Sequence, residues 1–294
     1  MAVAEYPVFE LQLESSERIE ELGSKPKFWV RLPDKSSWLF KFGRPNTGED
    51  WAEKLGAEVA ALLCLTHARV ELARFGQKHG SVSLSFVSDE TDLIHGNEIL
   101  PGHVLGYDAA KRFGQCDHTF GHIVAAFYDL FPEGEARNEA LTALAGYFTL
   151  DAIICNVDRH HENWAVLRSI PPAAPSLKVA PTFDHASSLG RELRDEKRAK
   201  LIESKQVGQY VLRGSGGIYW KETDPKGENP LRLCLRAAAV HRTYFQPWID
   251  RVKELTEAEL ELLVSRVPGD WMSEIAKKFA VAMMSFTTKE LKKL

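Results

Sequence analysis

The chain has 294 residues, of which 44% are hydrophobic and 27% are charged, and its formal net charge is −4. A chain of this size and composition can bury a full core, as one large domain or two small ones. The slightly acidic balance excludes a strongly basic overall field, so nucleic acid is not expected as a direct partner.

Cysteine usage and the N-terminal segment point to a reducing compartment. The four cysteines lie far apart and form no CxxC pair, which favours free thiols over a disulfide framework or a zinc site. The N-terminus contains acidic residues and no uninterrupted apolar segment. No stretch approaches the roughly 18 apolar residues that a membrane span needs. We therefore expect a cytoplasmic protein without a membrane partner.

The first part of the chain is predicted to be β-structure around one helix. Two short runs rich in aromatic and branched side chains, PKFWVRLP and SSWLFKFG, flank the turn at residues 33–35 and predict a hairpin. Residues 49–65 combine an acidic first turn with apolar residues at helical spacing, which predicts a helix. Two more strands are expected in VELARFG and SVSLSFV. This order of elements is that of the N-terminal lobe of a protein kinase.

Helices dominate the rest of the chain. They are expected over residues 118–130, 137–154, 191–203 and 230–251, and from about residue 257 onward. Two strand-like runs, WAVL and LKVAPTF, flank a Pro-rich loop, and the Gly-rich residues 213–230 are expected to form a mobile surface loop. The predicted fold is α/β (α+β), bilobal and protein-kinase-like. A β-rich N-lobe is expected over residues 1–100 and a helical C-lobe over residues 101–294.

Acidic and amide side chains follow the predicted helix of residues 137–154. Residues 158–163 read DRHHEN, which places Asp158 and Asn163 five positions apart, and Asp184 follows 26 positions after Asp158. Kinases use this spacing for a carboxylate that faces the acceptor hydroxyl and an amide that holds magnesium together with a later aspartate. We therefore predict Asp158 as catalytic and Asn163 and Asp184 as Mg²⁺ ligands. The alternative is a helix end with a surface ion pair and an asparagine in a turn.

Three histidines in the same segments raise the alternative of a metal-dependent hydrolase. His160 and His161 are adjacent and His185 follows Asp184. Adjacent histidines do not easily bind one ion, and the sequence has no HExxH motif. We expect His160 to pack beneath the loop at the nucleotide site and His161 to face solvent.

A lysine on an apolar strand is the candidate phosphate anchor. Lys41 lies between two phenylalanines in WLFKFG, and a buried ammonium group needs an anionic partner. Glu58 on the predicted helix of residues 49–65 is the expected partner, which places it in the catalytic set with Lys41, and Glu53 is the second choice. The alternative is that Lys41 lies on an exposed edge strand, where its charge increases the solubility of the protein.

The segment that would cover the nucleotide carries no GxGxxG motif. Instead, LGSKPKF supplies Gly23, Ser24 and Lys27, whose backbone N–H groups and ammonium charge could bind phosphates. The alternative is a polar turn that enters a strand. We expect the adenine of ATP against the chain near residues 86–89, where Phe86 and Ser88 are the candidate contacts.

These segments together resemble the HipA-like serine/threonine kinases, a family that includes the toxin kinases of bacterial toxin–antitoxin modules and shorter relatives. The similarity rests on GSKPKFWV, WLFKFG, the glutamate of GAEVAALLCL, NVDRHHENWAV and APTFDHASSLG, and it covers roughly residues 20–190. The resemblance implies that the family's NxDRHxxN loop corresponds to five residues here: Asn156, Asp158, Arg159, His160 and Asn163.

The resemblance also implies roles for two further positions and for the whole protein. The family's metal-binding aspartate corresponds to Asp184 after Phe183, and its autophosphorylated serine to Ser24. The implied activity is that of an ATP- and Mg²⁺-dependent serine/threonine protein kinase, and the toxin members of the family imply a translation component as substrate and an antitoxin as partner.

Two alternatives keep the fold and change the function. Phosphoinositide kinases also combine DRHxxN with a later IDFG- or IDHG-like string, but residues 191–205 mix acidic with basic side chains and make a poor patch for anionic lipid. A catalytically inactive regulator is the other alternative. The joint presence of Lys41, Asp158, Asn163 and Asp184 argues against it, because a scaffold has no physical need for all four.

Overall fold

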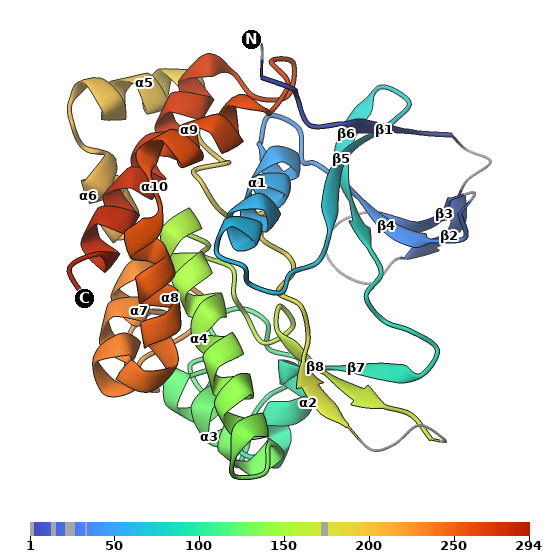
Figure 1. The fold of residues 1–294 in the computed structure, drawn as a ribbon, viewed down its shortest axis with the longest axis vertical. Coiled ribbons are helices and arrows are strands. Elements are labelled where there is room, and N and C mark those ends of the chain that lie inside the picture. The colour runs from blue at the N-terminus through green and yellow to red at the C-terminus, as the bar shows by residue number, and fades with distance from the viewer. Residues whose placement is uncertain (1–2, 13–15, 21–26, 33, 172–175) are drawn as a thin grey trace.

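The computed structural model describes residues 3–12, 16–20, 27–32, 34–171 and 176–294. Within these ranges the chain forms two β-sheets and a set of helices (Figure 1). The larger sheet has the order β1-β5-β6-β4-β3-β2 and the smaller has the order β7-β8-β9. The strands are β1 (Val8–Leu11), β2 (Ser16–Glu20), β3 (Lys27–Arg31), β4 (Ser37–Phe42), β5 (Val70–Phe75), β6 (Lys78–Leu84), β7 (Thr91–His95), β8 (Ala165–Ser169) and β9 (Leu177–Val179).

The helices lie mainly in the second half of the chain. They are α1 (Glu49–Leu62), α2 (Gly96–Ile99), the 3₁₀ helix η2 (Leu100–Gly102), α3 (Phe120–Leu130), α4 (Glu135–Ile154), α5 (Asp195–Glu203), α6 (Val207–Arg213), α7 (Pro230–Val240), α8 (Arg242–Glu254), α9 (Glu257–Ser265) and α10 (Glu274–Leu291). None of the helices in the described ranges is long and apolar enough to span a membrane.

The predicted hairpin is formed by β3 and β4, which pair in antiparallel fashion with Lys27 opposite Lys41. Because side chains alternate between the two faces of a strand, both lysines lie on one face. On the other face, Phe28 and Phe40 pack into a small core with Val82 of β6. The predicted strands β5 and β6 also pair with each other. The alternation thus keeps Lys41 out of the aromatic core.

Helix α1 forms where the sequence predicts a helix and packs between the larger sheet and the helical part of the molecule (Figure 1). Its middle contains Gly56, where an added Cβ atom would lie 2.5 Å from the Cβ atom of His185. Only glycine allows this approach without displacement. Gly56 therefore brings α1 directly against the segment that contains Asp184.

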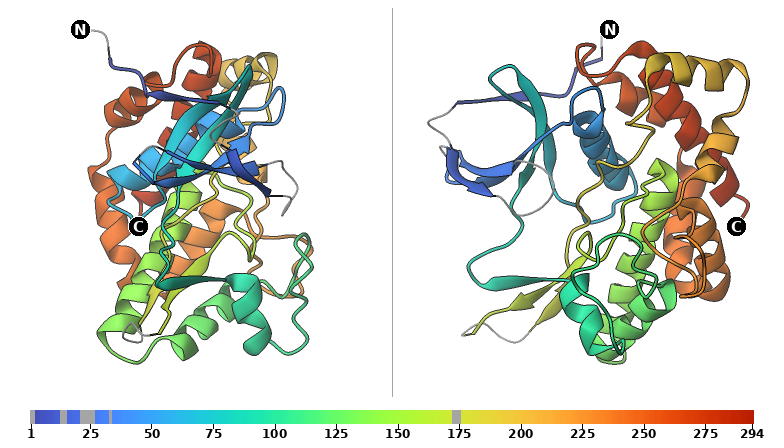
Figure 2. Two further views of the ribbon diagram at one scale, coloured as in Figure 1. Left: turned by 90° about the vertical axis from the view of Figure 1, so that its right-hand side faces the viewer. Right: turned by 180° about the vertical axis from the view of Figure 1, so that it is seen from behind.

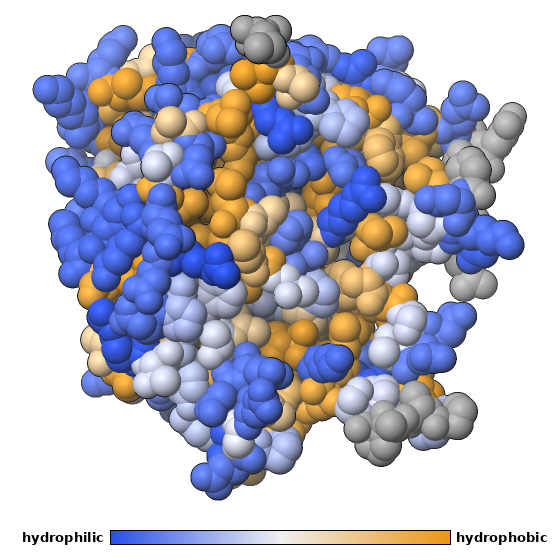
Figure 3. Space-filling view, in the orientation of Figure 1, coloured by the Kyte–Doolittle hydropathy of each residue, from blue (hydrophilic) through white to orange (hydrophobic). Residues whose placement is uncertain are grey.

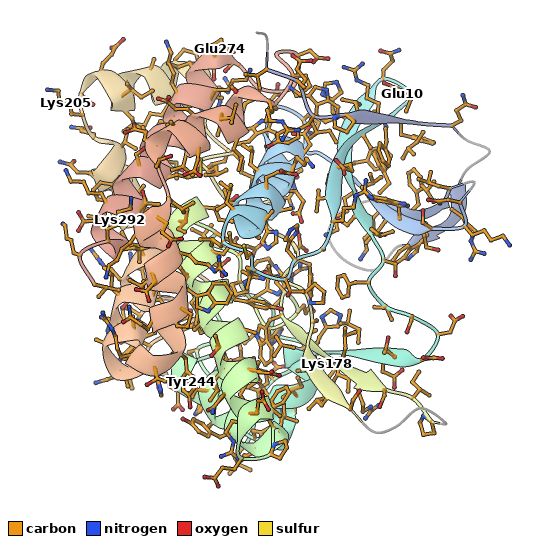
Figure 4. All side chains as sticks on the ribbon, viewed as in Figure 1. Glu10, Lys178, Lys205, Tyr244, Glu274 and Lys292 are labelled. Atoms are coloured by element: carbon orange, nitrogen blue, oxygen red, sulfur yellow. The ribbon has the colours of Figure 1, made fainter. Side chains whose placement is uncertain are left out.

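Two predicted helices are each divided in the structure. The expected helix over residues 230–251 is α7 followed by α8, with a break at His241, whose ψ angle of 46° is not helical. The break lets both helices pack against α4. The predicted C-terminal helix is α9 followed by α10, and Pro268 and Gly269 lie in the interval between them. Glu274 and the C-cap Lys292 mark the two ends of α10 (Figure 4).

The expected surface loop over the Gly-rich residues 213–230 is correct only in part: residues 221–223 and 225–226 are exposed, but the residues on either side of them pack against the rest of the protein. Ile218 and Tyr219 are buried. A Cβ atom at Gly217 would lie 3.0 Å from backbone atoms of Arg159 and His160. The glycine here permits close approach to the predicted catalytic loop, which a propensity argument cannot distinguish from flexibility.

The smaller sheet lies apart from the larger one, as the views from the side and from behind show (Figure 2). Strand β7 follows the larger sheet along the chain but pairs with β8, which belongs to the helical part. On this pairing we propose that the join between the lobes lies in the connection between Leu84 and Thr91, before the expected boundary at residue 100. In the orientation of Figure 1, hydrophilic side chains cover much of the helical side (Figure 3).

Asp50 in the first turn of α1 predicts a pH-dependent stability. It is buried, and burial raises its pKa from 3.8 to about 7. The unfolded chain therefore loses this proton near pH 4 and the folded chain near pH 7. The stability contributed by the protonated group is complete below pH 4 and is lost at about 1.4 kcal/mol per pH unit as the pH rises toward 7.

Asp50→Asn should flatten this dependence, because the amide stays neutral and its oxygen can still accept from Trp51 N, at 2.8 Å in the wild type. Unfolding midpoints at pH 5 and pH 8 measure the effect. The control is Asp250→Asn, which changes an exposed carboxylate on α8. Equal pH dependence in wild type and Asp50→Asn would contradict the assignment.

Candidate active site

The predicted catalytic loop begins where α4 ends. Cys155 adopts a left-handed conformation with φ 55° and stops the helix. Asn156 then donates from Nδ2 to Asp151 Oδ1 at 2.9 Å and accepts at Oδ1 from Asp158 N at 3.1 Å. The two bonds fix the turn that presents Asp158 beyond the end of the helix.

Arg159 joins the catalytic loop to the segment before Asp184. It is buried and donates to both carboxylate oxygens of Asp151, at 2.8 and 2.7 Å. The same guanidinium donates to Asn163 O at 2.6 Å and to Phe183 O at 3.1 Å. Because the guanidinium is a rigid plane, these bonds hold the backbones of Asn163 and Phe183 at one site.

Asp158 and Asn163 are linked within the loop. Asn163 donates from Nδ2 to Asp158 O at 2.7 Å. The amide oxygen of Asn163, Oδ1, takes no part in this bond. The Asp158 side chain is 37% exposed, and Ser187 Oγ donates to its Oδ2 at 3.3 Å. Burial, together with the nearby charge of Asp184, raises the pKa of Asp158. The two carboxylates thus concentrate negative charge at one place.

Asp184 meets the lysine of β4. It adopts a left-handed φ of 60°, which is uncommon for a residue with a side chain and is found at functional sites. Its Oδ1 lies 3.3 Å from Lys41 Nζ. Burial alone would lower the pKa of Lys41, but the charges of Asp184 and Glu53 outweigh it, and the pKa is raised. Lys41 is therefore an ammonium group beside Asp184.

The expected pairing of Glu58 with Lys41 is wrong. Glu58 Oε1 lies 2.6 Å from Lys54 Nζ, four residues earlier on α1. Lys54 also pairs with Glu71 of β5 at 2.8 Å. Glu53 is buried on the face of α1 that packs on His185, and its charge acts on Lys41. Glu53, the second choice as partner, is thus the glutamate of α1 whose charge raises the pKa of Lys41.

The three histidines each make a different hydrogen bond. His160 packs in the loop, as predicted: it accepts from Glu162 N at 3.2 Å, and burial lowers its pKa to about 3. His161 is buried beside the Tyr107 hydroxyl at 2.8 Å, so the prediction that it faces solvent is wrong. His185 bonds Thr182 Oγ1 at 2.9 Å. Tyr107 and His118, which lie next to His161, come from irregular segments far away in the sequence, which the local pattern could not reveal.

The structure describes only some of the residues that are predicted to contact the nucleotide. Gly23 and Ser24 lie outside the described residues. Lys27 is the cross-strand neighbour of Lys41. The ring of Phe86 lies 5.8 Å from that of Phe183, next to Asp184. Ser88 is hydrogen-bonded to Thr91, the first residue of β7. Its backbone N donates to Thr91 Oγ1 at 3.1 Å, and the two hydroxyl oxygens lie 3.2 Å apart.

Three site residues were not anticipated from the sequence. Arg112 Nε lies 3.1 Å from His160 Nε2, and the charge of Arg112 lowers the pKa of Asp158. Ser187 and Arg191 approach Asp158 from the segment after Asp184. Ser187 lies three residues after Asp184 and was visible in the string DHAS, whereas Arg112 lies in an irregular segment with no motif.

The donor set fits a hard divalent cation. Carboxylate and amide oxygens are the ligands that magnesium accepts, and it commonly uses one or two carboxylates together with nucleotide phosphates. Asp184 and the Asn163 amide oxygen supply such atoms, and the repulsion between Asp158 and Asp184 that raises the Asp158 pKa would be relieved by a cation. The residues present therefore fit the predicted metal.

Comparison with known proteins identifies the fold. No protein-family model and no curated protein matches the sequence. Among solved structures, the proinflammatory kinase CtkA of Helicobacter pylori superposes with a TM-score of 0.78 at 16% identity, over 98% of this chain and 96% of that chain. HipA of Shewanella oneidensis MR-1, solved with HipB and operator DNA, gives a TM-score of 0.52 at 13% identity, over 94% of this chain and 67% of that chain. The predicted kinase-like fold is confirmed.

Proposed function

We propose that the protein is an ATP- and Mg²⁺-dependent serine/threonine protein kinase of the HipA-like type. The observation that carries the proposal is the contact of 3.3 Å between Lys41 and Asp184. It occurs where Arg159 holds the backbones of Asn163 and Phe183 together. On this proposal, Lys41 is the anchoring lysine, and Asp184 and Asn163 supply the carboxylate and the amide for the metal.

Each side chain has a role that its surroundings support. The Lys41 ammonium binds phosphate oxygens, and Lys27 beside it adds positive charge. Asn163 and Asp184 would hold Mg²⁺, which would neutralise charge on the phosphates. Asp158 orients the acceptor hydroxyl. The hydroxyl oxygen bonds to the γ-phosphorus, the bond to the bridging oxygen breaks and ADP leaves, and the hydroxyl proton passes to the Asp158 carboxylate.

The acceptor is proposed to be a serine or threonine of a protein. The solved HipA is part of a toxin–antitoxin system and is bound to HipB and DNA. By this similarity, we propose a toxin role with an antitoxin as partner. From the family resemblance of the sequence, we propose a translation component as substrate, and from the cysteine usage a cytoplasmic location. Autophosphorylation of Ser24 belongs to the same proposal, and so do Gly23, Phe86 and Ser88 as nucleotide contacts.

The acceptor class is tested with γ-labelled ATP and Mg²⁺, given either a cytosolic extract or phosphoinositide vesicles. We expect label on serine or threonine of a protein, found by mass spectrometry of the labelled band. Label in the lipid fraction alone would assign a lipid kinase instead. Bound ATP with no transfer to either acceptor would assign an inactive regulator.

The two glutamates of α1 are expected to differ in their effect on turnover. Glu53→Gln removes a charge that acts on Lys41, and we expect it to lower kcat roughly tenfold or more, since misplacement by about 1 Å can cost a hundredfold. Glu58→Gln is the matched control, because Glu58 pairs with Lys54. Steady-state kinetics of both variants measure this. A larger loss in Glu58→Gln would reverse the assignment.

A further inference from the structure

A chain of polar contacts leads from Asp158 to the start of α1. Ser187 Oγ donates to Asp158 Oδ2 at 3.3 Å and accepts from Arg191 Nη2 at 3.1 Å. The backbone supports the same approach, because Val157 N donates to Ser187 O at 3.2 Å. Asp158 is thus held from the segment after Asp184 through both its own side chain and its neighbour's backbone.

Arg191 is held in turn by a buried carboxylate. Its Nη1 lies 2.9 Å from Oε1 of Glu49, the first residue of α1, which is 3% exposed. Glu49 also accepts from Arg44 N at 3.1 Å and Arg44 Nη1 at 3.2 Å, just after β4. In addition, Gly48 N donates to Arg191 O at 2.9 Å. The contacts therefore connect the strand of Lys41 with the catalytic loop.

We propose that Ser187 and Arg191 are positioning residues for Asp158, and that Glu49 holds Arg191 in place. This inference rests on the proposed kinase function. A side chain that is 37% exposed can adopt several rotamers, and one hydrogen bond from a fixed hydroxyl selects among them. The buried Glu49 fixes Arg191, Arg191 fixes the Ser187 hydroxyl, and the hydroxyl fixes one Asp158 oxygen, so that the acceptor hydroxyl meets a carboxylate already oriented.

Kinetics separate this role from a general effect on folding. Ser187→Ala is expected to lower kcat roughly ten- to hundredfold, the cost of small misplacement, with KM for ATP changed less than twofold. Ser187→Thr keeps the hydroxyl and should recover most of the loss. Arg191→Ala should match Ser187→Ala, and the double variant should be no slower than the slower single variant, because the two residues act in series.

Two variants serve as matched controls. Arg168→Ala breaks an exposed ion pair with Asp92, and Ser265→Ala removes an exposed hydroxyl on α9. Both should retain the wild-type kcat. Equal loss in Ser187→Ala and Ser187→Thr, or additive losses in the double variant, would overturn the inference.

An NMR measurement tests the inference without relying on enzyme activity. In metal-free protein labelled with ¹³C at the aspartate carboxyls, the Asp158 resonance is assigned by its absence in Asp158→Asn. We expect Ser187→Ala and Arg191→Ala to move this resonance at fixed pH, and the two controls to leave it in place. An unmoved resonance would overturn the inference even if the protein is a kinase. A wild type without transfer would refute the proposed function, and the resonance would still decide the contact.

Discussion

Replacement of Asp158 by alanine is expected to lower the rate of phosphoryl transfer by roughly 10²–10⁴-fold, the usual contribution of a positioned general base. The carboxylate lies in a loop fixed by Asn156 and by Arg159, and neither of these residues needs the Asp158 side chain to keep its own contacts with Asp151. The fold and the binding of ATP should therefore survive. Single-turnover transfer and calorimetric titration with ATP measure the two quantities.

Asp158→Asn separates charge from shape. The amide keeps the size of the side chain and can still accept from Ser187, but it cannot take a proton, so we expect nearly the same loss as in Asp158→Ala. Burial and Asp184 raise the Asp158 pKa, so the wild-type rate should fall as the pH drops through a value above 3.8. If Asp158→Ala or Asp158→Asn transferred the phosphoryl group as fast as the wild type, Asp158 would not act on the acceptor.

Replacement of Arg159 by leucine is expected to destabilise the fold by about 3–5 kcal/mol, because one charge of a buried pair would remain without its partner. Arg159 and Asp151 are 2% and 4% exposed. The variant also frees the backbone carbonyls of Asn163 and Phe183. Denaturant unfolding measures the stability, and transfer assays should show loss of activity even where the variant is folded.

The double variant Asp151→Leu/Arg159→Leu tests the cause. If the unpaired carboxylate is responsible, removal of both charges should recover part of the stability, while activity stays low because the bonds to Asn163 and Phe183 are still missing. A double variant less stable than Arg159→Leu would show that the other bonds of Asp151, such as the one from Asn156, stabilise the fold more than its unpaired charge destabilises it.

Local patterns predicted the parts of the protein that local forces determine. The runs PKFWVRLP and SSWLFKFG predicted the hairpin of β3 and β4, and helical spacing predicted α1 and α4. The strand-like runs after Asn163 do pair, as β8 and β9. This pairing is the one that the predicted site of Asn163 and Asp184 requires, because the two residues flank the paired strands in sequence.

The choice between two glutamates on one helix needed more than the apolar pattern. Glu53 and Glu58 are five residues apart, or about 140° around a helix, so they cannot both face Lys41. The sequence did hold a useful signal, since Lys54 and Glu58 have the i,i+4 spacing of helix ion pairs. This spacing predicts that Glu58 pairs with Lys54, so that Glu53 is the glutamate available to act on Lys41.

Contacts between distant segments could not be predicted in this way. His161 is polar, yet it is buried, and its Nδ1 is hydrogen-bonded to the Tyr107 hydroxyl of an irregular loop. Gly217 indicated flexibility but is needed for close approach to Arg159. Arg112, Ser187 and Arg191 reach Asp158 only once the chain is folded. Each case depends on a partner that sequence spacing does not identify.

The central claim is that Lys41, Asp158, Asn163 and Asp184 form one phosphoryl-transfer site. The most direct test is transfer from γ-labelled ATP to protein at increasing Mg²⁺, for wild type, Asp184→Asn and Asp92→Asn as the exposed control. We predict Mg²⁺-dependent label with wild type and the control, and none with Asp184→Asn. Equal labelling by Asp184→Asn, or labelling unaffected by removal of Mg²⁺, would contradict the claim.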